Sequence, residues 1–460
     1  MTRNIILLIG DGLSPGFIGL AQQFKQRISG RKLRMTEVLL EGTPAYLTTF
    51  NFDAMISDSA SAATAIACGQ KTRNGLLGLT PSGRRCESIL EKSLKAGKHA
   101  GLVTTTSLTH ATPAAFAAHT AHRENEAEIA AQMLAQGIQV LMGGGAGYWL
   151  PAAAPGSLRA DERDLLREAG ERNYTLLSSA ADLRGLDPSA ASPLLGLFNR
   201  RHMNFEIDRD PQMEPSLAEM TTSALNRLRQ APDGFFLMVE GGRIDHAAHE
   251  NDLAALLHEI LAFDEAVGCA LDYQAEVNDT LIIITADHET AGLVHSSNYF
   301  GEQSPGSHPS HESLSQLAHV TASFEAMLAL PQQKRDPFLL QKVFYQHTGI
   351  PLDLLRAEMA LSIEAANGSY YWEQNILGKT IEERTGIGFV CADHTANPVL
   401  LLAKGPGADR IHGVIDNIEL FRVMCKAFGI DHVQTCPAPL PAQAAIFTTD
   451  MRSLSDQVYY

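Results

Sequence analysis

This 460-residue sequence has no long hydrophobic run, no Cys-x-x-Cys pair and no excess of basic charge. Its longest apolar runs, such as residues 5–9, fall far short of the about 20 residues that a membrane-spanning helix requires. The even number of cysteines permits disulfides, but their spacing argues against a thiolate metal site. A formal net charge of −16 argues against nonspecific binding to nucleic acid or membranes, since both need a basic face.

The start of the chain and its charge set two further expectations. The first core strand begins almost at Met1, which leaves no room for a signal peptide. The chain is therefore expected to be either cytosolic or a protein whose targeting segment has been removed. A surface this acidic would repel an anionic substrate, so such a substrate would need a local positive field, which bound metal ions would supply.

Apolar runs typical of fully buried strands recur along the chain, with helical stretches between them. They lie at residues 3–12, 100–106, 138–143, 234–240, 280–285 and 398–403. This alternation predicts an α/β fold with a doubly wound, mostly parallel central sheet and helices on both faces. Ligands of such sheets bind beyond the carboxyl ends of the strands. Asp11, residues 106–112, Glu240 and the pair Asp287 and His288 all lie at or just past predicted strand ends, which favours a single site.

Two segments interrupt this pattern and set the predicted domain boundaries. Residues 148–200 are rich in alanine, proline and glycine and are predicted to be a surface excursion. Residues 296–388 have helical stretches but no core-strand pattern, which predicts a large inserted subdomain, helical or crown-like. The catalytic α/β core is then residues 1–295 and 389–433, and residues 434–460 form a C-terminal tail.

The segment Asp58-Ser59-Ala60-Ser61 opens an alanine-rich run that predicts a helix. Serine and aspartate are common N-caps, which gives Ser59 a purely structural interpretation. A hydroxyl at a helix N-terminus also faces backbone N–H groups and a positive dipole, which suit a bound anion. Ser59 does not stand in a Gly-x-Ser-x-Gly elbow, so metal coordination would have to activate it as a nucleophile.

Residues 239–250 (VEGGRIDHAAHE) place Asp245 and His249 four positions apart, which is one turn on one helix face. This is a common spacing for two ligands of one metal ion. Glu240 precedes them at a strand end. A solvated helix face would explain the carboxylates, but His246 and His249 together favour a metal site.

Two further motifs hold candidate ligands. Asp287 and His288 directly follow an apolar strand, and an adjacent pair at a strand end can serve one metal ion. His394 stands before the last core strand and would complete a site that already holds Asp245 and His249. Each of these motifs is weak when it is taken alone.

The stretch at residues 109–123 (THATPAAFAAHTAHR) predicts a helix that begins near Thr112, because Pro113 suits a first helical turn. Arg123 is predicted to lie further along the same helix. A guanidinium pairs bidentately with phosphate, which lysine cannot imitate, although a surface salt bridge explains an arginine equally well.

Taken together, these segments closely resemble the alkaline phosphatase family, in wording nearer its vertebrate-like branch than its enterobacterial one. The matching pieces are NIILLIGDG, SDSASAATAIACGQKTRNG, THATPAAFAAHTAHR, LLGLF, GFFLMVEGGRIDHAAHE, TLIIITADHE and ADHT, in the family's order over residues 4–403. The resemblance implies hydrolysis of phosphate monoesters at alkaline pH through a phosphoserine. It also implies a homodimer and a periplasmic or secreted location.

By matched position, the resemblance implies a role for each candidate residue. Ser59 would be the nucleophile, Arg123 would clamp two phosphate oxygens, and His246 would bind substrate through water. Two zinc ions and one magnesium ion per chain are implied. Their ligands would be Asp11, Asp287 and His288 for the zinc beside Ser59; Asp245, His249 and His394 for the other zinc; and Asp11, Thr112 and Glu240, with His110 nearby, for magnesium.

Two departures from the family and two rival functions stay open. His110 and His246 occupy positions where the enterobacterial enzyme has aspartate and lysine, so a third zinc or a cobalt ion could replace magnesium. The superfamily also contains phosphodiesterases. From another class, the chain could be a catalytically weak phosphate- or metal-binding protein, although no expected ligand is missing.

Overall fold

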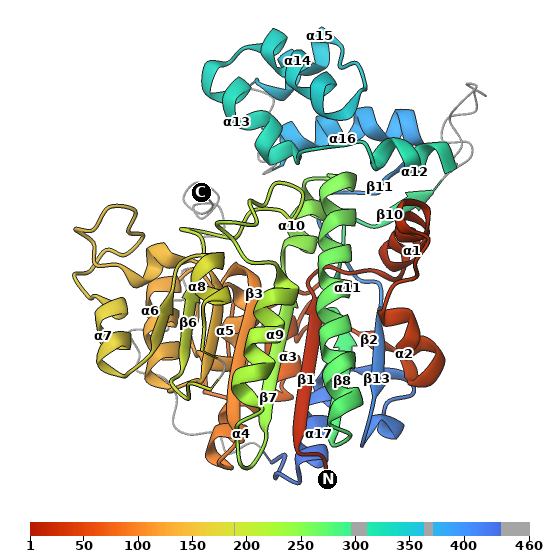
Figure 1. Cartoon of the computed structure of the whole chain (residues 1–460). Coiled ribbons are helices and arrows are strands. Elements are labelled where there is room, and N and C mark those ends of the chain that lie inside the picture. The colour runs from red at the N-terminus through yellow and green to blue at the C-terminus, as the bar shows by residue number, and fades with distance from the viewer. Residues whose placement is uncertain (188, 296–310, 363–370, 434–460) are drawn as a thin grey trace.

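The computed structural model describes residues 1–187, 189–295, 311–362 and 371–433 (Figure 1). The predicted α/β class is confirmed: its centre is one ten-stranded sheet in the order β14-β2-β13-β8-β1-β7-β3-β4-β6-β5. Its neighbouring strands are parallel except where β13 pairs with β8 and β2. In chain order the strands are β1 (Asn4–Gly10), β2 (Thr43–Thr48), β3 (His99–Ser107), β4 (Val140–Gly144), β5 (Thr175–Leu177), β6 (Leu194–Leu197), β7 (Phe235–Gly241), β8 (Thr280–Thr285), β13 (Val399–Lys404) and β14 (Gly413–Asp416).

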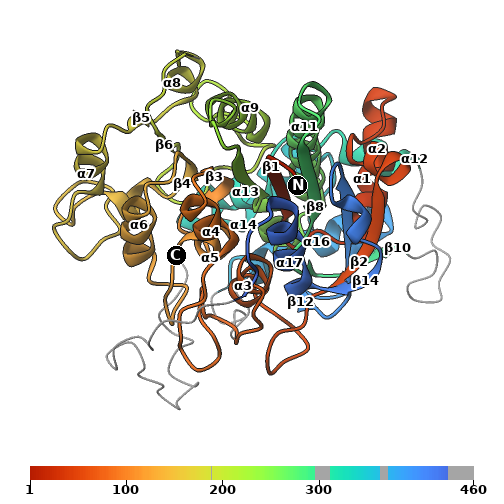
Figure 2. The same cartoon turned by 90° about the horizontal axis from the view of Figure 1, so that it is seen from below.

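The central strands are apolar along their whole length because helices cover both faces of the sheet. The strand β1, with the sequence NIILLIG, is buried at every position. One face carries α1 (Pro15–Ser29), α2 (Met35–Glu41), α9 (Leu217–Leu228) and α11 (Leu253–Glu276), and the other carries α3 (Ser59–Cys68), α4 (Ile89–Lys95), α5 (Ala111–Ala117) and α17 (Asn417–Phe428) (Figure 2). The helices α6 (Glu126–Ala135), α7 (Leu165–Glu171) and α8 (Ala180–Arg184) lie toward the β5 edge.

One local expectation needs correction. The segment at residues 148–200, predicted as a surface excursion, contributes β5 and β6 to the sheet, and β6 is buried and parallel to β4. Strands of three and four residues are too short to show a periodicity, so the sequence pattern missed them. The strand predicted at residues 398–403 forms as β13 and is the antiparallel strand in a sheet that was predicted to be mostly parallel.

Helices make up most of the described part of the predicted insertion. They are α12 (His311–Leu317), α13 (Phe324–Lys334), α14 (Pro337–Thr348), α15 (Leu354–Ala360) and α16 (Trp372–Thr385), and they lie beyond the carboxyl ends of the parallel strands (Figure 1). Treating them as a separate subdomain stays a prediction, and the tail at residues 434–460 lies outside the described residues. No helix among the described residues is long and apolar enough to cross a membrane.

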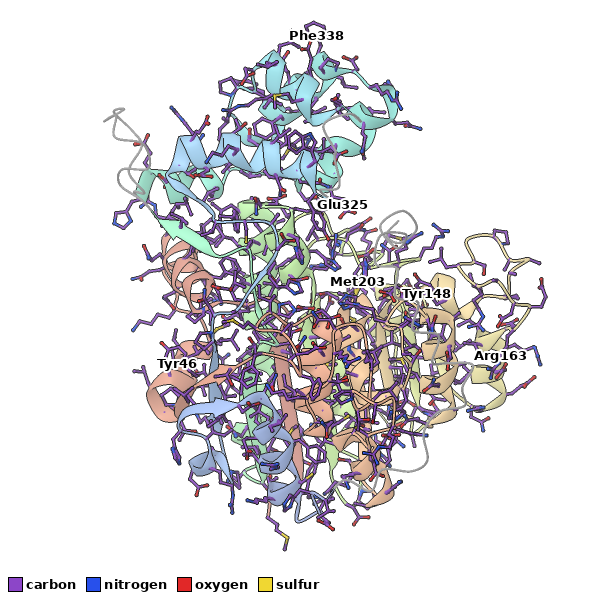
Figure 3. All side chains as sticks on the ribbon, turned by 180° about the vertical axis from the view of Figure 1, so that it is seen from behind. Tyr46, Tyr148, Arg163, Met203, Glu325 and Phe338 are labelled. Atoms are coloured by element: carbon purple, nitrogen blue, oxygen red, sulfur yellow. The ribbon has the colours of Figure 1, made fainter. Side chains whose placement is uncertain are left out.

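The N-terminus of α13 is attached to the core at three successive residues. The Ser323 N–H donates to Asp208 at 3.0 Å, and the Phe324 N–H donates to Asp252 at 2.6 Å. The Glu325 carboxylate, at the junction between the inserted helices and the core, pairs with Arg243 at 2.5 Å (Figure 3). The start of the inserted helix is therefore fixed next to α10 (Arg243–His249), which follows β7.

Candidate metal centre and active site

The strand register places Asp11 and Asp287 at equivalent positions just beyond the carboxyl edge of the sheet. Ile9 of β1 pairs with Glu240 of β7 on one side and with Thr285 of β8 on the other. Asp11 and Asp287 each stand two residues beyond this level in parallel strands. They therefore leave the carboxyl edge of the sheet side by side, which places four oxygen ligands in a small volume.

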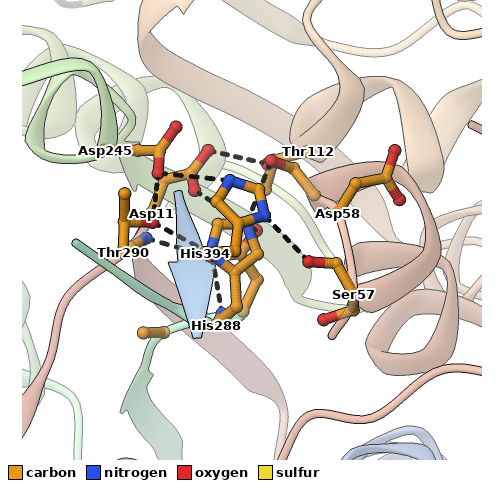
Figure 4. Close-up of polar contacts among 12 residues, drawn as sticks. Asp11, Ser57, Asp58, Thr112, Asp245, His288, Thr290 and His394 are labelled. Atoms are coloured by element: carbon orange, nitrogen blue, oxygen red, sulfur yellow. Dashed lines mark hydrogen bonds and ion pairs between the residues drawn. The ribbon is translucent and has the colours of Figure 1, made fainter. Parts of the chain in front are cut away.

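A first cluster joins Asp245 and His249 of α10 to His394, which reaches the same edge because β13 runs antiparallel to β8. Figure 4 shows Asp245 and His394 of this cluster. His249 Nε2 lies 3.3 Å from Asp245 Oδ2 and 3.1 Å from His394 Nε2. His249 Nδ1 lies 2.5 Å from the Ala392 carbonyl oxygen, and His394 Nδ1 lies 2.8 Å from the Ser57 carbonyl oxygen. Because a carbonyl oxygen only accepts hydrogen bonds, each neutral ring carries its proton on Nδ1 and presents the lone pair of Nε2 to the centre of the cluster. Two lone pairs and a carboxylate fit a metal ion.

A second cluster surrounds His288 Nε2. This atom lies 3.2 Å from Ser59 Oγ, 3.3 Å from Asp287 Oδ2 and 3.5 Å from Asp11 Oδ1. Ser59 is the first residue of α3, whose N-cap is Asp58, so its hydroxyl stands at the positive end of that helix. The predicted nucleophile thus contacts His288, whose Nε2 lies close to the other two ligands predicted for one zinc.

A third cluster consists of Asp11, His110 and Glu240, whose ligand atoms all lie within 4.8 Å of one another. The Thr112 hydroxyl lies 3.4 Å from Asp11 Oδ2, and the Thr106 hydroxyl donates to Glu240 Oε2 at 3.2 Å. Within the described part of the chain, Asp11 Oδ1, His110 Nδ1 and Glu240 Oε1 are buried and have no hydrogen-bond partner. Buried polar atoms without partners are unfavourable, so their convergence fits a bound cation.

Burial and mutual repulsion oppose ionisation of these carboxyl groups. Burial, followed by the charges of Asp287, Asp245 and Glu240, raises the pKa of Asp11 well above its ordinary value. Burial raises the pKa of Glu240 and of Asp287 to about 7. Burial also acts on Asp245, but neighbouring imidazoles, first that of His249, outweigh it and hold the pKa of Asp245 well below its ordinary value. Divalent cations would stabilise the ionised carboxylates.

The raised pKa values of Glu240 and Asp287 predict that these two groups contribute a loss of stability to metal-stripped protein as the pH rises. A carboxyl whose pKa is higher when folded binds more protons in the folded state, so the free energy of unfolding falls with increasing pH between the two values. For Glu240 and Asp287 this window runs from about 4 when unfolded to about 7 when folded.

We therefore expect the thermal midpoint of chelator-treated wild-type protein, measured relative to that of chelator-treated Glu240→Gln, to fall between about pH 4 and about pH 7. The variant lacks one of these titrating groups, whereas buried histidines such as His288, whose pKa burial lowers, act in the opposite sense and are common to both proteins. The metal-loaded proteins are the control. A difference between the two midpoints that stays constant or changes in the opposite direction over this range would contradict the expectation.

Arg123 joins the site from a turn and not from the helix predicted to carry it. The helix α5 ends at Ala117 because Ala118 adopts an extended conformation and Thr120 forms an isolated β-bridge. Arg123 Nη1 lies 3.2 Å from Asp58 Oδ2, and its Nη2 lies 3.0 Å from His110 Nε2. The guanidinium therefore stands beside the residue that precedes Ser59.

Two residues near this site were missed by the sequence reasoning. The ring of His202 lies 4.6 Å from that of His246 and 5.8 Å from that of His110, measured between centroids. Arg243 Nη1 donates to His246 Nδ1 at 2.8 Å. His202 follows β6, so the strand-end argument would have found it had β6 been recognised. Arg243 stands inside the predicted ligand motif, but its partner Glu325 is remote in sequence.

The fold and the clusters define a class of protein: an α/β chain with a carboxylate–imidazole centre of adjoining cation sites around a serine at a helix N-terminus. A family pattern described as alkaline phosphatase matches residues 2–430 of this chain. The chain belongs to the alkaline phosphatase family, which confirms the resemblance seen in the sequence.

Individual relatives agree with this membership. The chain is 38% identical over 315 residues to the repressible alkaline phosphatase of Saccharomyces cerevisiae, which covers 64% of this chain and 56% of that protein. It is 32% identical over 433 residues to alkaline phosphatase 4 of Bacillus subtilis, and the match covers 92% of this chain and 88% of that protein. The crystal structure of Thermus thermophilus alkaline phosphatase is similar with a TM-score of 0.86 at 31% identity, covering 95% of this chain and 93% of that one.

Proposed function

We propose that this chain is a metal-dependent phosphomonoesterase that works at alkaline pH. A phosphate monoester would be hydrolysed to an alcohol and inorganic phosphate. The observation that carries the proposal is the position of the Ser59 hydroxyl, 3.2 Å from His288 Nε2 at the junction of the candidate cation sites. A hydroxyl held there is suited to attack a phosphorus atom whose oxygens the site binds.

Two zinc ions and one magnesium ion per chain are proposed as the cofactors. The clusters with Asp245, His249 and His394, and with Asp11, Asp287 and His288, offer the mixed imidazole and carboxylate ligands that zinc prefers. The cluster with Asp11, Thr112 and Glu240 is richer in oxygen, which suits magnesium. Bound there, the ions would supply Lewis acidity and neutralise charge that builds up on phosphate oxygens.

The chain's own residues would hold the phosphate and its reacting atoms. Ser59 Oγ would form a bond to phosphorus while the alcohol oxygen leaves, and water would then release phosphate from the serine. Arg123 would donate to two phosphate oxygens, since Asp58 holds its guanidinium close to Ser59. Arg243 donates to His246 Nδ1, so the neutral His246 ring carries its proton on Nε2 and would donate toward the substrate.

The proposal is tested with p-nitrophenyl phosphate and bis-p-nitrophenyl phosphate, assayed at alkaline pH. We expect a strong preference for the monoester that is lost on chelation and restored by added zinc and magnesium. A preference for the diester would instead assign the chain to a phosphodiesterase function. If the protein binds metal but hydrolyses neither compound, the function would instead be that of a phosphate- or metal-binding protein.

Assembly and location are part of the same proposal. Large apolar side chains are exposed at Phe50, Phe52, Met55 and Ile56, close in sequence to the nucleophile. Such a group of exposed apolar side chains supports an interface with a second copy, in agreement with the homodimer that the family resemblance implies. That resemblance also supports a periplasmic or secreted location.

A further inference from the structure

The contact between Arg123 and His110 fixes which ring nitrogen of His110 carries a proton. Arg123 Nη2 lies 3.0 Å from His110 Nε2. A guanidinium has only donors, so Nε2 must present its lone pair to it. The neutral His110 ring then carries its proton on Nδ1.

The opposite side of the same ring faces the third cluster. His110 Nδ1 lies 4.0 Å from Glu240 Oε1. In the described residues neither atom has a hydrogen-bond partner, and the same holds for Asp11 Oδ1. A cation among these atoms needs a lone pair on Nδ1, and so does a cation-bound water, which points its hydrogens outward. A proton on Nδ1 is incompatible with either arrangement.

Neighbouring imidazoles do not supply the missing lone pair. His202 Nδ1 accepts the Ser107 N–H at 3.0 Å, and His246 Nδ1 accepts from Arg243 at 2.8 Å. Both neutral rings therefore carry their protons on Nε2. Their edges also pack against His110, with centroids 5.8 Å and 5.6 Å away, which restricts the ring from turning aside.

We propose that His110 couples Arg123 to the cation in the third cluster. When the cation binds, the His110 proton moves from Nδ1 to Nε2, which then faces the Arg123 donor and breaks that contact. The guanidinium is released to bind phosphate. Conversely, phosphate that draws Arg123 away frees His110 to turn a lone pair toward the cation. This inference rests on the proposed function of the site.

Thermodynamic linkage makes the effect reciprocal: the cation and phosphate must strengthen each other's binding by the same factor. We expect a factor of about 10, within the range usual for coupled sites. The measurement is isothermal titration calorimetry on protein already loaded with zinc. Inorganic phosphate is titrated with and without saturating Mg²⁺, and Mg²⁺ is titrated with and without saturating phosphate.

Variants separate this mechanism from simple attraction between a cation and an anion. In His110→Ala both ligands should still bind, but the factor should fall several-fold, because only the electrostatic attraction between the cation and phosphate remains. If that attraction were the whole cause, the wild-type factor would persist. His202→Gln, which changes an adjacent ring whose Nδ1 accepts from the Ser107 N–H, is the matched control and should keep the wild-type factor. A double-mutant cycle with Arg123→Ala should show that the two substitutions are not additive.

The outcomes distinguish this inference from the proposed function. Equal phosphate affinity with and without Mg²⁺ in the wild-type protein, or full coupling in His110→Ala, would overturn the inference while monoester hydrolysis stands. Absence of monoester hydrolysis in the wild-type protein would overturn both.

Discussion

Replacing Ser59 with alanine is expected to lower kcat/KM for a phosphate monoester by about 10³-fold or more, as losses of a covalent nucleophile do. The side chain is the hydroxyl nearest to His288 and stands at the first position of α3, where the helix dipole favours an anionic oxygen. Residual hydrolysis would come from the cation sites and Arg123, which the substitution leaves in place. Steady-state kinetics with p-nitrophenyl phosphate measures the effect.

The bound metal in Ser59→Ala should stay close to the wild-type content, because the carboxylates and imidazoles of the clusters are unchanged. Ser61→Ala is the matched control. Ser61 lies on the same helix and is buried, but its hydroxyl contacts Asn74 and not the clusters. Values of kcat/KM for Ser59→Ala and Ser61→Ala that agree within a few-fold would contradict the covalent mechanism.

The second large effect is expected from Asp245→Asn or His394→Ala. Either substitution takes one of three ligands from the first cluster, so each should lower bound zinc by about one ion per chain. Activity should fall with it, since Asp245 also lies within the cluster of Asp11 and His288. Elemental analysis of dialysed protein gives the stoichiometry, and the kinetic assay gives the rate.

Asp393→Asn is a suitable control for His394→Ala. Asp393 is the exposed neighbour of His394, and its backbone contact with Ala291 does not depend on the side chain. This variant should keep its zinc and its activity. Wild-type zinc content in Asp245→Asn and His394→Ala would overturn the assignment of that site.

The cation centre could be predicted because its residues obey a simple geometric rule. Asp11, Glu240 and Asp287 end three adjacent strands whose apolar sequences were recognisable, and parallel strands end at the same edge. Asp245 and His249 share one helix turn, so their spacing alone placed them together. The roles of these residues in catalysis stay a prediction, as does the identity of each metal.

Features that depend on long-range contacts could not be predicted in the same way. The alanine-rich sequence after Pro113 favours a helix through Arg123, but the bridge at Thr120 ends it, which is tertiary structure overriding local propensity. The direction of β13 depends on the intervening helices and has no signature in its own sequence. His202 depends on recognising β6, a strand of four residues.

The attachment of α13 to the core has a consequence for exchanging parts between members of the family. Glu325 comes from the inserted helices, yet it holds Arg243, which in turn sets the proton position on His246. Transplanting another enzyme's insertion into this chain would therefore require an acidic residue at the same position of the first turn. Without it, a graft that folds well would leave the buried Arg243 guanidinium without its ion-pair partner beside the candidate site.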